Sequence, residues 1–281
     1  MSAMMRAMTV TPQRLAELLP QVVDLARQAG REIMRVYDGH FDVMLKDDDS
    51  PLTAADIASQ NVIAAGLRAL APDIPLLAEE SAAADVVDRR SWRTLWLVDP
   101  LDGTREFVKR NGEFTVNIAL VHDHVPLLGV LYAPVAGLSY YAVRGAGAEC
   151  QDSEGRRRPL HVTDRCQEPP RVLASRSHRG ARIDALLQQL GQHEIVSVGS
   201  ALKFARLAEG AADFYPRLSP TSEWDTAAGQ VIVEAAGGQV TDLHGMPLRY
   251  NARDTLVNSD FIAWADPSRQ WATLCTTVFT A

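Results

Sequence analysis

The chain has 281 residues, of which 47% are hydrophobic and 22% charged, a composition that is typical of globular proteins and excludes collagen, coiled coils and disorder. Its 28 basic and 35 acidic residues give a net charge of −7, which excludes a generally basic surface for nucleic acid. Cys150, Cys166 and Cys275 form no CxxC pair, so we expect no disulfide framework, no thiolate zinc site and a reducing, cytoplasmic location.

The first part of the chain predicts two helices and then a series of short strands. Thr11-Pro12 begins a helix whose apolar positions continue at helical spacing to Val36, and Pro20 is expected to kink or split it. Thr53 caps a second helix, with apolar positions as far as Leu70. The strand-like runs IPLLAEE, TLWLVDP, FTVNIALV, PLLGVLYAP and LSYYAV follow. We therefore predict helices packed on an antiparallel sheet.

The uncharged stretch Val125–Val143 is long enough to span a bilayer. It is interrupted by prolines and glycines, with a turn signal at Pro134–Gly137. Two buried strands joined at this turn explain the stretch better than a transmembrane helix does. We expect a soluble protein with no transmembrane segment.

The second part of the chain predicts alternating strands and helices, which is typical of an α/β unit. The strand-like runs are RVLASRS and EIVSVGS, and the helical patterns are Ala201–Glu209 and Thr226–Gly237. A seam near Glu168–Arg171 divides the chain into halves 1–168 and 169–281. We expect these halves to form one compact catalytic domain.

The hexapeptide Asp99-Pro100-Leu101-Asp102-Gly103-Thr104 follows the apolar run Leu95–Val98. Its proline and glycine force a turn, and its two carboxylates and an intervening carbonyl can converge on a hard cation such as Mg²⁺. The backbone N–H groups of Gly103 and Thr104 are suited to hold an anion. The alternative is an ordinary Asp-Gly turn with an Asx hydrogen bond.

Other acidic residues lie at comparable positions. Glu79-Glu80 ends a strand-like run, as Asp99 does, and Asp225 follows Trp224 at a predicted helix start. Each has a structural alternative, which is a solvated loop for the glutamates and an N-cap for Asp225. Asp56 likewise has a capping alternative through Thr53.

The motifs LAEES, LVDPLDGT and EWDTAAG, in this order, resemble the inositol monophosphatase superfamily of Mg²⁺-dependent, lithium-sensitive phosphatases over roughly Leu15–Asn258. The resemblance implies a layered αβαβα sandwich, with an antiparallel sheet in the first half and an α/β unit in the second. It implies two or three Mg²⁺ ions, held by Glu79, Asp99, the Leu101 carbonyl, Asp102 and Asp225. It also implies that Asp56 and Thr104 activate the attacking water.

Within this superfamily, SPLTAADIASQ, DPLDGTREFVKRNGEFTVNIALV, SRSH and GSALKF resemble the bacterial 3′(2′),5′-bisphosphate nucleotidases, which convert adenosine 3′,5′-bisphosphate to AMP and phosphate in sulfur assimilation. The resemblance implies substrate contacts from Gly103, Thr104, His178, Ser200, Lys203 and Arg217. The alternatives are a solvated helix lysine for Lys203 and a capping or surface histidine for His178. The charged residues Arg105, Lys109 and Arg110 either add positive potential at the site's mouth or form a solvated loop.

Two rival functions share these motifs. One is an inositol monophosphatase or a fructose bisphosphatase, and the other is a non-catalytic nucleotide- or metal-binding protein. We expect a small-molecule nucleotide substrate and no nucleic-acid partner. Weak association with the inner face of the cell membrane is known among relatives, although this sequence contains no anchor, and the oligomeric state stays open.

Overall fold

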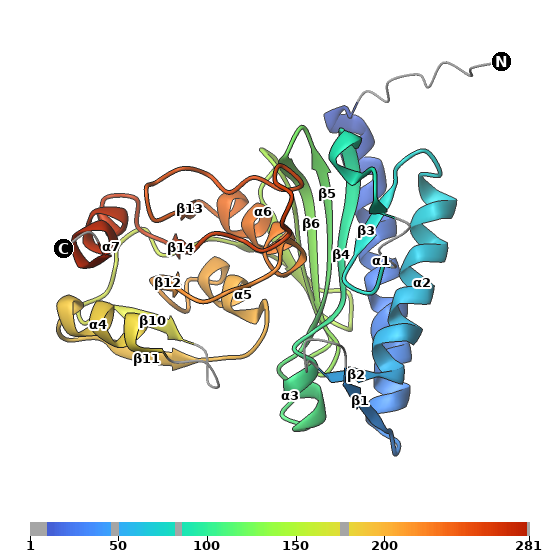
Figure 1. Ribbon diagram of the computed structural model, residues 1–281, viewed down its shortest axis with the longest axis horizontal. Coiled ribbons are helices and arrows are strands. Elements are labelled where there is room, and N and C mark those ends of the chain that lie inside the picture. The colour runs from blue at the N-terminus through green and yellow to red at the C-terminus, as the bar shows by residue number, and fades with distance from the viewer. Residues whose placement is uncertain (1–9, 46–50, 82–85, 175–179, 280–281) are drawn as a thin grey trace.

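Helices and sheets alternate in five layers across the molecule (Figure 1). The computed structural model describes residues 10–45, 51–81, 86–174 and 180–279. Within these residues, the layers are a helix pair, a seven-stranded sheet, a second helix pair, a five-stranded sheet and a third helix pair. Separate apolar clusters lie on the two sides of each sheet, with the largest between the sheets. The predicted αβαβα sandwich is confirmed.

The seven-stranded sheet has its strands in chain order, and only its first pair, β3 and β4, is parallel. The strands are β3 (Leu76–Ala78), β4 (Thr94–Asp102), β5 (Thr115–His122), β6 (Val125–Ala133), β7 (Leu138–Val143), β8 (Ala148–Gln151) and β9 (Arg157–Leu160). The uncharged stretch forms β6 and β7, as predicted. Among the described helices, none combines the length and apolar character that crossing a membrane requires.

Two long helices, α1 (Pro12–Tyr37) and α2 (Ala54–Leu70), cover the outer face of this sheet (Figure 1). Of the two expected effects of Pro20, a kink or a split, the split is wrong, because α1 is continuous through it, and the kink stays a prediction. Pro20 has no N–H to donate to the carbonyl one turn earlier in the helix, but it is exposed, so water can bond that carbonyl instead. The buried face of α1, with Val22, Ala26 and Ile33, lies on the other side of the helix. The short strands β1 (Val43–Leu45) and β2 (Pro51–Thr53) pair just before α2, and a 3₁₀ turn, η2 (Arg89–Ser91), precedes β4.

The five-stranded sheet has the order β11-β10-β12-β14-β13. Its strands are β10 (Arg171–Ala174), β11 (Glu194–Ser197), β12 (Phe214–Arg217), β13 (Gln239–Asp242) and β14 (Phe261–Trp264). Parallel pairing joins β10 to β11 and β12, as an α/β unit requires, whereas β14 and β13 are antiparallel additions that the sequence did not predict. Helices α4 (Ala181–Leu190) and α7 (Trp271–Phe279) cover its outer face, where the rings of Phe214 and Trp271 stack 4.2 Å apart.

The middle layer joins the two sheets. It consists of α5 (Leu202–Ala208) and α6 (Ala227–Ala235), which follows the 3₁₀ turn η3 (Glu223–Asp225). Helix α6 lies so close to β6 that a Cβ at Gly129 would stand 2.5 Å from the carbonyl oxygen of Ala228. The first sheet ends at Leu160 and the second begins at Arg171, yet one apolar cluster contains residues from both. The division at residue 168 stays a prediction.

Candidate active site

A bulge in β4 shapes the Asp99–Thr104 segment. Asp99 pairs with Asn117 and Asp102 with Thr115, so Pro100 and Leu101 together stand opposite one residue of β5. The strand therefore continues to Asp102 instead of ending before Asp99 as the sequence suggested. A proline is tolerated here because a bulge needs no ladder donor. The Leu101 N–H donates to Asp99 Oδ1 over 3.0 Å, which is the Asx hydrogen bond of the structural alternative, so the turn and the acidic site coexist.

Carboxylates from both halves of the chain meet beside this bulge. Asp99, Asp102 and Asp225 each offer an oxygen, and these oxygens lie within 4.8 Å of one another. Glu79 and these three aspartates line one cavity, which is described below. The N–H of Glu79 donates to the carbonyl of Val98 over 3.1 Å. This contact follows from the parallel pairing of β3 with β4, which brings both strands to one edge of the sheet.

We define the acidic cluster as Glu79, Asp99, Asp102 and Asp225. Burial raises the pKa values of its three aspartates. Burial, and then the charges of its neighbours in the cluster, raise the pKa of Asp99 well above its ordinary value. Burial and the charge of Asp102 raise the pKa of Asp225 to about 8. Burial also raises the pKa of Asp102, against the opposing charge of Lys203. Asp99 is buried and the other three carboxylates are half-buried. Carboxylates this close ionise together more easily with a cation among them, and an all-oxygen donor set suits a hard divalent ion.

Asp56, which is not part of the acidic cluster, lies in the first turn of α2 and faces the start of α3 (Thr104–Val108). Its Oδ2 accepts bonds of 2.7 Å from both the N–H and the hydroxyl of Thr53, which is the predicted capping role. Its Oδ1 accepts a bond of 3.2 Å from the hydroxyl of Thr104, and that hydroxyl also lies 3.3 Å from the carbonyl of Leu101. Asp56 therefore caps its helix and also holds Thr104 beside the acidic cluster.

A cavity of about 340 Å³ opens over the acidic cluster. The sequence-predicted site residues that line it are Glu79, Asp99, Leu101, Asp102, Gly103, Thr104, Ser200, Lys203, Arg217 and Asp225. Asp56 contacts it through Thr104. His178 lies outside the described residues. The other lining residues include Glu106, Tyr215 and Trp224, which sequence reasoning did not single out.

Lys203 is buried in the wall of this cavity, with 4% of its surface exposed, so the alternative of a solvated helix lysine is wrong. Its ammonium donates to the carbonyls of Ser200 (2.7 Å) and Val198 (3.3 Å). Burial lowers its pKa to about 8. The turn that Lys203 holds in this way contacts the acidic cluster directly, because the N–H of Ala201 donates to Asp102 Oδ2 over 2.5 Å.

Arg217 and Arg110 differ in whether their guanidinium groups are available to bind an anion in the cavity. Arg217 lines the cavity and donates from Nη2 to the carbonyl of Pro220 over 3.2 Å, while its buried Nε has no hydrogen-bond partner within the described part of the chain. Arg110 instead donates to the carbonyls of Tyr37 and Gly39 at the end of α1. Arg110 is exposed and does not line the cavity, and its two bonds tie the end of α1 to the segment just after α3.

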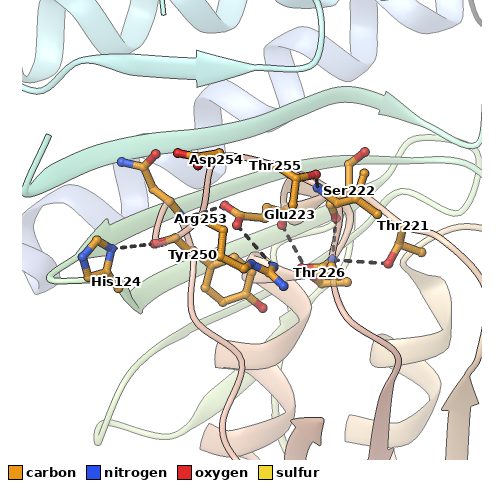
Figure 2. A network of polar contacts seen from close by, with 12 residues as sticks. His124, Thr221, Ser222, Glu223, Thr226, Tyr250, Arg253, Asp254 and Thr255 are labelled. Atoms are coloured by element: carbon orange, nitrogen blue, oxygen red, sulfur yellow. Dashed lines mark hydrogen bonds and ion pairs between the residues drawn. The ribbon is translucent and has the colours of Figure 1, made fainter. Parts of the chain in front are cut away.

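A polar network around Glu223 and Ser222, which the sequence analysis missed, lies beside Asp225 in the chain (Figure 2 shows Glu223, Ser222 and their partners). The carboxylate of Glu223, which is fully buried, accepts the N–H of Asn251 over 2.6 Å and pairs with Arg253 at 3.5 Å. The N–H of Ser222 donates to Asp225 Oδ2 over 2.8 Å. The side-chain amide of Asn258 donates to the carbonyl of Ser222 and to the hydroxyl of Thr226. The only sequence signal for this network was a second acid beside Trp224-Asp225.

Comparison with known proteins gives one consistent answer. The model of the inositol monophosphatase family matches residues 14–277. A 3′(2′),5′-bisphosphate nucleotidase CysQ from Escherichia coli K12 is 52% identical over 248 residues, which are 87% of this chain and 98% of that protein. The CysQ from Haemophilus influenzae is 35% identical over 258 residues, 92% of this chain and 96% of that one.

Solved structures agree with the sequence relatives. The crystal structure of CysQ from Bacteroides thetaiotaomicron has a TM-score of 0.75 and 41% identity, covering 89% of this chain and 97% of that one. The suhB protein of Bartonella henselae has a TM-score of 0.78 and 26% identity, covering 94% of this chain and 99% of that one. With the fold, the acidic cluster and these matches in agreement, this chain belongs to the inositol monophosphatase family.

Proposed function

We propose that this protein is a Mg²⁺-dependent 3′(2′),5′-bisphosphate nucleotidase that converts adenosine 3′,5′-bisphosphate to AMP and phosphate. The observation that carries the proposal is the cluster of the buried Asp99 with the half-buried Asp102 and Asp225, which lines a cavity that also has cationic side chains in its wall. The relatives named as bisphosphate nucleotidases, at up to 52% identity, support the choice of substrate. Its cellular role would be the removal of a by-product of sulfate activation in the cytoplasm.

The metal-binding residues follow from the donor set. The carboxylates of the acidic cluster and the Leu101 carbonyl would hold two or three Mg²⁺ ions, since these oxygens border one cavity. When bound, such ions supply Lewis acidity, lower the pKa of a coordinated water and neutralise phosphate charge. Glu79, Asp99 and Asp102 come from the first half of the chain and Asp225 from the second, so both halves must be in place for the site to form.

Thr104 and Asp56 supply the proton relay. The Thr104 hydroxyl donates to Asp56 Oδ1 over 3.2 Å, which leaves the hydroxyl oxygen available to accept a proton from the attacking water. The two bonds that Thr53 donates to Asp56 Oδ2 hold this carboxylate with Oδ1 toward Thr104, so Oδ1 can take the proton that Thr104 passes on. General-base assistance of this kind contributes about 10²–10⁴ in rate.

Arg217 is the best-placed cation for the non-reacting phosphate of the substrate. Its guanidinium borders the cavity and retains a buried N–H that nothing in the described chain accepts. Lys203 adds positive charge to the same wall, although two of its three protons are engaged by backbone carbonyls. Gly103, Thr104 and Ser200 border the cavity beside the acidic cluster and would contact the reacting phosphate, with His178 as a further nucleotide contact carried over from the family resemblance.

The test is phosphate release from adenosine 3′,5′-bisphosphate and from inositol 1-phosphate, with Mg²⁺ and with EDTA. We expect metal-dependent release with a clear preference for the bisphosphate. Asp102→Asn should lower turnover at saturating Mg²⁺ by at least about 10²–10³-fold. Faster hydrolysis of inositol 1-phosphate would favour the rival inositol phosphatase, and binding without turnover would favour the non-catalytic rival.

A pair of arginine variants tests the phosphate subsite. Arg217→Ala should lower kcat/KM for the bisphosphate about 10- to 150-fold, the range for losing a contact to a charged group, and should change inositol 1-phosphate hydrolysis little. Arg144→Ala is the matched control, because Arg144 is 49% exposed and pairs with Glu234 away from the cavity. Equal losses on both substrates in Arg217→Ala would contradict the subsite.

A further inference from the structure

Two polar side chains lie inside an otherwise apolar part of β5. Thr115 is fully buried and Asn117 is 1% exposed, while Val116, Ile118 and Ala119 around them are buried and apolar. Residues two apart on a strand face the same side, so Thr115 and Asn117 form a pair. Buried polar groups in a sheet need hydrogen-bond partners. The residue that accepts the last of these hydrogen bonds is the one whose side chain the pair holds in place.

The hydrogen bonds of this pair lead to Asp102. The hydroxyl of Thr115 donates to Asn117 Oδ1 over 2.7 Å, and Asn117 Nδ2 donates to Asp102 Oδ2 over 3.3 Å. The direction is fixed by chemistry, because an ionised carboxylate only accepts and must therefore face the amide nitrogen. Thr115 also lies 3.5 Å from Asp102 Oδ2, but its single proton is committed to the shorter bond.

One oxygen of Asp102 is consequently used for support. Oδ2 accepts the amide of Asn117 and the N–H of Ala201, at 3.3 and 2.5 Å. Within the described residues, no donor contacts Oδ1. A carboxylate whose one oxygen is held from two sides cannot rotate freely, so its other oxygen has a fixed direction.

We propose that Asn117, itself oriented by Thr115, is a positioning residue that fixes the Asp102 carboxylate for metal binding. The inference rests on the proposed role of Asp102 as a metal ligand. The hydrogen bond from Asn117 restricts the carboxylate before the cation arrives, so less conformational freedom is lost on binding. Removing such a supporting partner typically weakens metal affinity or activity about 10–100-fold.

Mg²⁺ binding measured by isothermal titration calorimetry on the full chain tests this inference without relying on turnover. Asn117→Ala should weaken Mg²⁺ binding about 10–100-fold. Thr115→Val removes only the donor that orients the amide, so the expected loss is about 2- to 10-fold, the range of one neutral hydrogen bond. Thr115→Ser keeps the donor and should bind Mg²⁺ like the wild type.

Ser139→Ala is the matched control. Ser139 is fully buried in β7 of the same sheet and accepts a bond of 2.9 Å from Arg27, outside the residues that line the cavity. This variant should lower the melting temperature and leave Mg²⁺ binding unchanged, which separates lost stability from lost positioning. If Asn117→Ala does not fold, the near-isosteric Thr115→Val still decides the question.

The variant Asp102→Asn separates the positioning role of Asn117 from the metal-ligand role of Asp102. If Asp102→Asn loses Mg²⁺ binding while Asn117→Ala and Thr115→Val bind like the wild type, the positioning role is overturned and the metal role of Asp102 stands. If Asp102→Asn itself binds Mg²⁺ normally, both are overturned. Weaker binding in all three variants, with Thr115→Ser and Ser139→Ala unchanged, supports the inference.

Discussion

The metal-free protein should lose stability as the pH rises from about 5 to about 8. Asp225 has a pKa of about 8 in the folded protein against an ordinary 3.8, and the pKa of Asp99 is also raised well above that value. Between the ordinary and the raised pKa, the folded state keeps a proton that the unfolded chain has released. Stability falls with pH wherever the folded state binds more protons, so the free energy of unfolding should decrease across this window.

The slope of the free energy of unfolding against pH measures how many protons the folded state retains. Each one changes the free energy of unfolding by about 1.4 kcal/mol per pH unit, so retention by Asp225 alone gives about that slope, and any proton that Asp99 retains makes it steeper. For a chain of this size, 1 kcal/mol corresponds to about 2 °C in melting temperature. We therefore expect a decrease of about 3 °C per pH unit for each proton. Lys203 leaves the lower part of this window undisturbed, because it is charged in both states well below its folded pKa of about 8. Near that pKa the folded state releases a proton that the unfolded chain keeps, which opposes the slope, so the decrease should be clearest between about pH 5 and about pH 7.

Calorimetric melting in EDTA across this pH range tests the reasoning. Saturating Mg²⁺ should raise the melting temperature and flatten the slope, because a bound cation keeps the carboxylates ionised in the folded state. Asp225→Asn should remove the slope due to one proton in EDTA. A metal-free melting temperature that is constant or rises with pH, or a slope that Asp225→Asn leaves unchanged, would refute the electrostatic account of the acidic cluster.

Three further predictions concern the cavity wall, the cation and the junction of the halves. Lys203→Ala should lower kcat/KM for both the bisphosphate and inositol 1-phosphate, because its ammonium holds the Ser200 and Val198 carbonyls; a loss confined to the bisphosphate would instead indicate a direct phosphate contact. LiCl should inhibit turnover relative to KCl at equal ionic strength, as the family resemblance implies, and a flat LiCl curve would contradict this. Gly129→Ala should destabilise the fold by about 1–3 kcal/mol in denaturant unfolding, because its methyl would press on Ala228, whereas Gly180→Ala, with nothing within 4 Å, should change stability little.

The sequence predicted those parts of the site that depend on local order. LAEES and LVDPLDGT each follow an apolar run, and parallel pairing of β3 with β4 brings Glu79 beside Asp99. The capping pattern from Thr53 to Asp56 was also visible, because it needs only residues three apart. The layered fold followed from the resemblance that these motifs carry and from the change in strand pattern between the halves.

Contacts between distant segments were not predictable in the same way. Lys203 follows a helical pattern that suits a surface residue, and its burial in the cavity wall involves the separate strand β12, where its ammonium lies 5.6 Å from the centre of the Tyr215 ring. The pairing of Asn117 with Asp102 requires the β4 bulge, which no local pattern specifies. Strand β12 contains Pro216 and is four residues long, so it shows no usable alternation. Asp225 depends on Glu223 and on a segment near residue 251 that carries no motif.

The division of the ligands between the halves has a mechanical consequence. Asp99 and Asp102 belong to the first sheet, and Asp225 enters from the start of α6, with their oxygens within 4.8 Å of one another. A cation held among them would act as a cross-link between the first sheet and the turn η3 that precedes α6, in the way that a disulfide joins distant segments. The halves could then separate only by releasing it. A higher metal concentration would therefore shift the equilibrium further toward the closed, cross-linked molecule, in addition to supporting turnover of substrate.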